Sequence, residues 1–120
     1  MRRIITILSN FQTKFTLDIN NLPSDSIGIF KLDDYTFDTF IEKSSVVVVK
    51  YQIPGCKHCV DFKSMYDDLV IKFLIEEAED IKFAEVNCMN FDSLDVCTEQ
   101  GVEGFPSVMM YKVIHIPKIH

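Results

Sequence analysis

Two cysteines three residues apart, Cys56 and Cys59, are the residues in this sequence best suited to chemistry. A thiolate attacks a disulfide to form a mixed disulfide, and a second cysteine close by can attack that intermediate and release it. Lys57 and His58 stand between the two cysteines and add positive charge nearby, which favours thiolate over thiol. The pattern therefore predicts thiol–disulfide exchange in which Cys56 attacks and Cys59 resolves.

The segments on either side of this motif would place Cys56 at the beginning of a helix. The β-branched run from Val46 to Tyr51 is typical of a strand buried on both faces, and a turn at residues 53–55 follows it. Residues 56 to about 77 carry apolar side chains at helical spacing. Unpaired backbone N–H groups and the helix dipole would lower the pKa of Cys56 there.

Two alternatives compete with redox chemistry at this pair. The two cysteines could form an inert structural bridge, or they could be half of a zinc site. A zinc site needs a second closely spaced pair, whereas Cys88 and Cys97 are nine positions apart and are separated by a predicted loop and helix start. We therefore predict no metal and no cofactor.

The remaining segments alternate between strand and helix patterns. Strands are predicted over residues 27–32, 81–86 and 107–111, a helix after the N-cap candidates Asp33 and Asp34, and a short helix over 92–99. This order predicts an α/β fold with a sheet between layers of helices. We expect a leader or linker at residues 1–26, one domain at 27–112 and a short tail at 113–120.

Composition excludes several classes of function. The formal net charge is -6 and the basic residues are scattered, so we expect no nucleic-acid partner. No apolar run reaches the length of about 18 residues that spans a bilayer, so we predict no membrane span. Residues 1–8 resemble the opening of a signal peptide, but Ser9 and Asn10 interrupt it early, and secretion is not predicted from this feature.

Three ordered motifs resemble the protein disulfide isomerase family. Residues 51–59, YQIPGCKHC, resemble the family's active-site segment FYAPWCGHC. The segment from Leu32 through Ile41 is similar to its first helix, and residues 101–107, GVEGFPS, are similar to its GVRGYPT turn. The resemblance covers about residues 27–112 and implies a thioredoxin-like three-layer α/β/α fold with a central mixed sheet.

The resemblance also implies roles for individual residues. Cys56 would be the attacking cysteine and Cys59 the resolving one, and His58 would stabilise the reduced form. The implied substrate-binding residues are Gly55, Lys57, Phe105 and Pro106, and Pro106 matches a cis-proline that faces the cysteine pair. Cys88 and Cys97 match positions where some members carry a structural disulfide; the alternative is two buried free thiols.

Three departures of the sequence from the family pattern bear on the chemistry and the fold. Gly55 replaces a tryptophan, which removes an aromatic surface beside the site. Lys50 replaces the acidic residue that the family buries beneath its cysteines as a proton acceptor, and this lysine could either point inward or extend to water. The last strand and helix of the family are not expected here, and a missing strand would leave unpaired backbone on its neighbour.

The resemblance implies a thiol–disulfide oxidoreductase, an enzyme of the protein disulfide isomerase type. It would act on cysteine-containing protein substrates or glutathione in the lumen of the endoplasmic reticulum. One alternative is a chaperone-like peptide-binding domain with weak redox activity, which the changes at Gly55 and Lys50 favour. Another is a cytoplasmic thioredoxin-like reductase.

Overall fold

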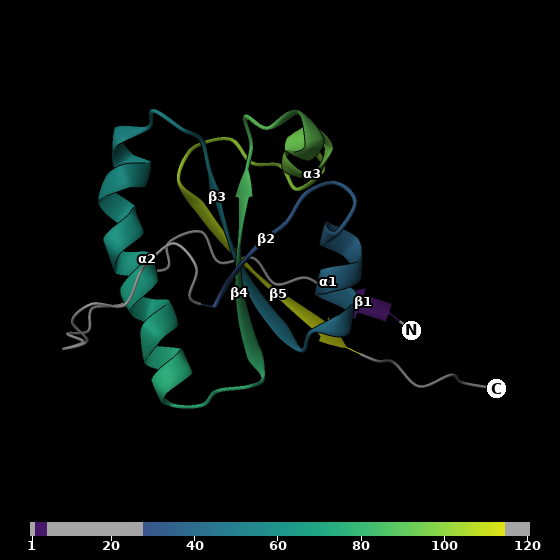
Figure 1. Cartoon of the computed structure of the whole chain (residues 1–120). Helices are drawn as coiled ribbons and strands as arrows, with labels where there is room; N and C mark the ends of the chain where they lie inside the picture. Colours follow the sequence, from purple (N-terminus) through teal and green to yellow (C-terminus); the bar gives the residue numbers. More distant parts are fainter. Residues whose placement is uncertain (1, 5–27, 115–120) are drawn as a thin grey trace.

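The computed structural model describes residues 2–4 and 28–114 of the chain. Its elements, labelled in Figure 1, are β1 (Arg2–Ile4), β2 (Ile29–Lys31), α1 (Phe37–Lys43), β3 (Val46–Gln52), α2 (Lys57–Ile75), β4 (Ile81–Asn87), the 3-10 helix η1 (Phe91–Ser93), α3 (Leu94–Glu99) and β5 (Ser107–Ile114). The predicted alternation of strands and helices is confirmed. The predicted leader and tail fall mostly outside the described residues, so those boundaries stay predictions.

The strands form one mixed sheet in the order β1-β5-β3-β4-β2. The β-branched strand β3 lies at its centre, parallel to β4 and antiparallel to β5. Opposite Lys50 of β3 lie Glu85 of β4 on one side and Val108 of β5 on the other. This register decides which side chains lie beneath the cysteine motif.

The edge of β5 that faces away from β3 is paired with β1. Arg2, Arg3 and Ile4 of β1 pair antiparallel with Ile114, Val113 and Lys112 of β5. The expectation of unpaired backbone at this edge is therefore wrong along these three residues, because a segment from the other end of the chain pairs there. Sequence patterns gave no sign of this pairing, since β1 has only three residues.

Helices cover both faces of the sheet, with α2 on one face and α1 and α3 on the other (Figure 1). Because side chains alternate along a strand, Val47, Val49 and Tyr51 of β3 pack on the α1 and α3 side, whereas Val48 packs beneath α2 with Tyr66 and Leu69. In the described part of the chain, none of the helices combines the length and the apolar character needed to cross a bilayer.

The start of α1 differs from the prediction. Its N-cap residue is Thr36, and Asp33 instead holds the preceding turn, accepting hydrogen bonds from the backbone N–H groups of Tyr35 and Thr36 at 2.9 and 3.0 Å. The Asp34 carboxylate accepts a hydrogen bond from the backbone N–H of Val96 at 2.8 Å. Asp34 thus joins the turn before α1 to α3, a role that local capping rules do not predict.

Candidate active site

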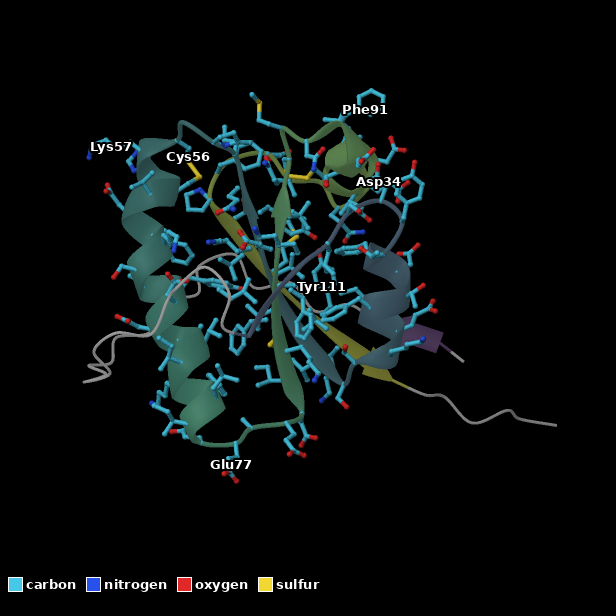
Figure 2. The ribbon with its side chains drawn as sticks, viewed as in Figure 1. Asp34, Cys56, Lys57, Glu77, Phe91 and Tyr111 are labelled. Atoms are coloured by element: carbon cyan, nitrogen blue, oxygen red, sulfur yellow. A yellow bond between two sulfur atoms is a disulfide. The ribbon has the colours of Figure 1, made fainter. Side chains whose placement is uncertain are left out.

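Cys56 is the N-cap residue of α2, at the end of the turn that leaves β3 (Figure 2). Its backbone is extended, and its Sγ accepts a hydrogen bond from the backbone N–H of Cys59 at 3.1 Å. The first turn of this 19-residue helix contains no acidic residue. The unpaired N–H groups and the positive end of the helix dipole therefore act on the Cys56 sulfur unopposed, which favours its thiolate.

The two cysteines of the motif differ in exposure. Cys56 is half-buried, whereas Cys59 is 5% exposed and faces the interior. They form a disulfide across a Cα–Cα distance of 5.2 Å. Cys56 is accessible to a substrate disulfide, whereas Cys59 is largely shielded from a protein substrate and lies within reach of Cys56. This asymmetry suits the roles of attacking and resolving cysteine.

The loop that precedes β5 reaches the cysteine pair from a distant part of the sequence. The Phe105–Pro106 peptide bond is cis, as expected, and both residues are half-buried. The carbonyl oxygen of Phe105 lies 3.9 Å from the Sγ of Cys56. Phe105, one of the predicted substrate-binding residues, thus lies beside Cys56, although 49 positions separate the two in the chain.

Three other predicted site residues, Gly55, Lys57 and His58, are close neighbours of Cys56 in the sequence. Gly55 directly precedes Cys56 and has a φ of 75°, a backbone conformation that favours glycine. A Cβ at this position would meet nothing within 4 Å, so the surface beside the cysteine is open. His58 is exposed, and the ammonium group of Lys57 pairs with Asp61 at 3.3 Å, one turn along α2.

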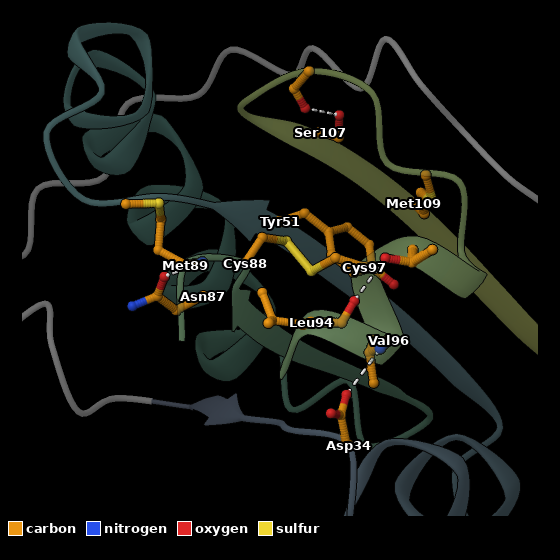
Figure 3. Close-up of a disulfide and its surroundings, with 12 residues drawn as sticks. Asp34, Tyr51, Asn87, Cys88, Met89, Leu94, Val96, Cys97, Ser107 and Met109 are labelled. Atoms are coloured by element: carbon orange, nitrogen blue, oxygen red, sulfur yellow. Dashed lines mark hydrogen bonds between the residues drawn. A yellow bond between two sulfur atoms is a disulfide. The ribbon is translucent and has the colours of Figure 1, made fainter. Parts of the chain in front are cut away.

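Cys88 and Cys97 are joined by a disulfide on the other side of the sheet (Figure 3). Their Cα atoms are 5.9 Å apart, and the bond ties the end of β4 to α3. Cys97 is buried in the same cluster as Tyr51, and Cys88 packs against that cluster. Among the residues that the structure describes, no three ligand side chains gather as a possible metal site.

Lys50 points inward rather than to water. Its side chain is 2% exposed, and its Nζ lies 4.9 Å from the centre of the Tyr66 ring on α2. Burial lowers the pKa of Lys50, while the negative charges of Glu85 and Asp67 oppose that shift. The open choice between an inward and an outward lysine is therefore settled in favour of the interior.

A cavity of about 420 Å³ lies beneath the motif between α2 and the sheet. Lys50, Cys59, Asp67 and Glu85 all contribute to its walls. Sequence reasoning did not single out Asp67 or Glu85. Neither carries a local signal, because their approach to Lys50 depends on the register of β3 with β4 and on which face α2 covers.

The sequence model of the family described as Thioredoxin matches residues 28–118. The chain belongs to the thioredoxin family. A protein disulfide-isomerase from Arthroderma benhamiae is 28% identical over 74% of this chain and 16% of its own length. Protein disulfide-isomerase 1 from Caenorhabditis elegans is 30% identical over 78% of this chain and 19% of its own length. This thioredoxin-family chain thus spans less than a fifth of these relatives.

The fold is also that of solved thioredoxin structures. The crystal structure of thioredoxin f2 from Chlamydomonas reinhardtii superposes with a TM-score of 0.57 at 29% identity, covering 71% of this chain and 75% of that one. The predicted thioredoxin-like α/β fold with a mixed sheet is confirmed. The cysteine pair at the start of α2 and the cis-proline loop beside it lie within the part of the chain that the family matches.

Proposed function

We propose that this chain is a thiol–disulfide oxidoreductase of the protein disulfide isomerase type, acting on disulfides of protein substrates. The observation that carries the proposal is the pairing of a half-buried Cys56 at a helix N-terminus with a buried Cys59 one turn later. The similarity to protein disulfide-isomerases supports the isomerase type over a general reductase.

The reaction follows from the different positions of the two sulfurs. In the reduced protein the Cys56 thiolate attacks one sulfur of a substrate disulfide, and the other substrate sulfur leaves as a thiolate. Cys59 then loses its proton and attacks the Cys56 sulfur. The substrate sulfur held on Cys56 leaves with its electron pair, and the protein retains the Cys56–Cys59 disulfide. Reversal of these steps oxidises a substrate dithiol.

Residues around the cysteines would hold the substrate and adjust the chemistry. His58 is exposed beside Cys56, where a positive imidazolium would stabilise the reduced thiolate form. Gly55, Phe105 and Pro106 would form the contact surface for the substrate chain, and Lys57 would add positive charge at its rim. The partners are cysteine-containing proteins or glutathione, and the lumen of the endoplasmic reticulum is the proposed location.

Turnover and trapping test the proposal together. The wild-type chain should catalyse insulin reduction by dithiothreitol, and Cys56→Ser should abolish that activity. Cys59→Ser should accumulate mixed disulfides with protein substrates, because the resolving step is lost. A matched control, Cys88→Ala with Cys97→Ala, removes the other cysteine pair and should retain catalysis when folded. A Cys56→Ser variant that still binds unfolded peptides, beside a wild type without turnover, would favour a binding domain instead.

A further inference from the structure

Lys50 lies on the face of the sheet that α2 covers. Side chains alternate along β3, and Val48, two residues earlier, packs against Tyr66 of α2. The Lys50 Nζ lies 4.9 Å from the centre of the Tyr66 ring, which shows that Lys50 also points toward α2. Lys50 is thus a cation held under the helix that begins at the cysteine motif, in the cavity to which Cys59 also contributes.

Charged groups from three elements face Lys50. Glu85 lies directly opposite on β4, and its carboxylate accepts a hydrogen bond from the side-chain amide of Gln52. Asp67, 7% exposed on α2, pairs with Lys63 at 2.8 Å. Glu85 has Lys50 of β3 opposite it on one side and Lys31 of β2 opposite it on the other. The two carboxylates oppose the lowering of the lysine's pKa by burial and favour its charged form.

We propose that Lys50 is a buried cation that stabilises the thiolate of Cys59 during the resolving step. The inference rests on the proposed function, since only an exchange reaction needs this thiolate. Cys59 is 5% exposed, and burial without a compensating charge would disfavour its ionised form. An ammonium group in the same cavity offsets that penalty. Glu85, opposite Lys50 on β4, favours the charged form of the lysine.

The proton balance of the step needs no further reactant. The Cys59 thiol releases its proton through the cavity, which opens to solvent, to water or buffer. The resulting thiolate attacks the Cys56 sulfur of the mixed disulfide, a new S–S bond forms, and the substrate sulfur leaves as a thiolate that takes up a proton. Lys50 stays protonated throughout and acts only through its charge.

The pKa of Cys59 can be measured without turnover. In a Cys56→Ser chain with the Cys88–Cys97 disulfide kept oxidised, Cys59 is the one free thiol, because the sequence contains four cysteines. Its alkylation rate by iodoacetamide is followed against pH by mass spectrometry. We expect a pKa at or below the ordinary thiol value of about 8.5, despite burial. Lys50→Met should raise that pKa by about one unit, leaving roughly tenfold less thiolate at neutral pH.

Two further variants separate charge from packing. Lys50→Arg keeps the charge and should leave the Cys59 pKa within a few tenths of a unit. Lys31→Met makes the same chemical change at an exposed lysine that lines the same cavity, and it should also leave the Cys59 pKa unchanged. An unchanged Cys59 pKa in folded Lys50→Met would overturn the proposal. If Lys50→Met does not fold, a Cys59 pKa above about 9.5 in the Cys56→Ser chain would overturn the proposal as well.

The insulin assay and the Cys59 pKa together distinguish failure of the lysine's role from failure of the proposed function. A wild type that reduces insulin, with a Cys59 pKa insensitive to Lys50, contradicts the role of the lysine and leaves the enzyme intact. A Cys59 pKa that rises in Lys50→Met, in a chain without turnover, supports the electrostatic role and contradicts the proposed function.

Discussion

Removal of the Cys88–Cys97 disulfide should cost a large share of the stability of this domain. The two cysteines are nine positions apart, and closing a loop of about ten residues restricts the unfolded chain by roughly 2.7 kcal/mol. Cys97 is also 8% exposed within the larger core cluster, so its truncation to alanine loses roughly 1 kcal/mol of packing. Cys88→Ala with Cys97→Ala should therefore lower the free energy of unfolding by about 3 to 4 kcal/mol.

Urea unfolding followed by circular dichroism measures this change. The background is a Cys56→Ser, Cys59→Ser chain, in which the reductant acts only on the Cys88–Cys97 bond. Reductant should destabilise this background by about 2.7 kcal/mol. It should not affect a variant in which all four cysteines are replaced. A loss below about 1 kcal/mol on replacing both cysteines would contradict this prediction, because the bond would then restrain neither the unfolded chain nor the core.

Three further predictions concern the turn, the α2 anchor and the response to alkali. Gly55→Ala should lower stability by about 1 kcal/mol in urea unfolding, because a Cβ has space there but a positive φ disfavours it; an unchanged stability would contradict this. Tyr66→Phe should lower stability by about 1 to 2 kcal/mol, since the hydroxyl lies within 3.0 Å of the carbonyl oxygens of β3 and β4; a neutral change would mean that these bonds contribute nothing. Burial raises the pKa of Tyr51 and Tyr66, and that of Tyr111 to about 12. Because these folded-state values exceed the unfolded value of about 10, stability should be retained below pH 10 and lost as the pH rises toward 12. In a Tyr35→Phe chain, which removes the exposed tyrosine, phenolate absorbance that precedes loss of circular dichroism would contradict this.

The sequence allowed the elements around the site to be predicted, because their signals are local. The β-branched run at residues 46–51 marks a buried strand, and Pro54 with Gly55 marks the turn that ends it. The apolar spacing after Cys56 marks α2. Together these three signals place Cys56 at a helix N-terminus without any knowledge of tertiary structure.

What the sequence could not reveal depends on contacts between distant segments. Tyr51 and Tyr111 share a hydrogen bond of 2.6 Å across 60 positions, which requires the pairing of β3 with β5. The orientation of Lys50 was undecided for the same reason. An unbroken run of valines does not show which face α2 covers, and only the register of β3 with β4 brings Glu85 opposite the lysine.

A redox titration of the Cys56–Cys59 pair against glutathione shows whether this pair exchanges disulfides. The fraction of protein with this pair oxidised is measured by alkylation and mass spectrometry at a series of glutathione ratios. We expect reversible equilibration near the poise of an oxidising compartment, about -180 to -210 mV. A pair that stays in one state across the whole series would contradict the proposed function, because thiols that do not exchange with glutathione cannot carry disulfides to or from a substrate.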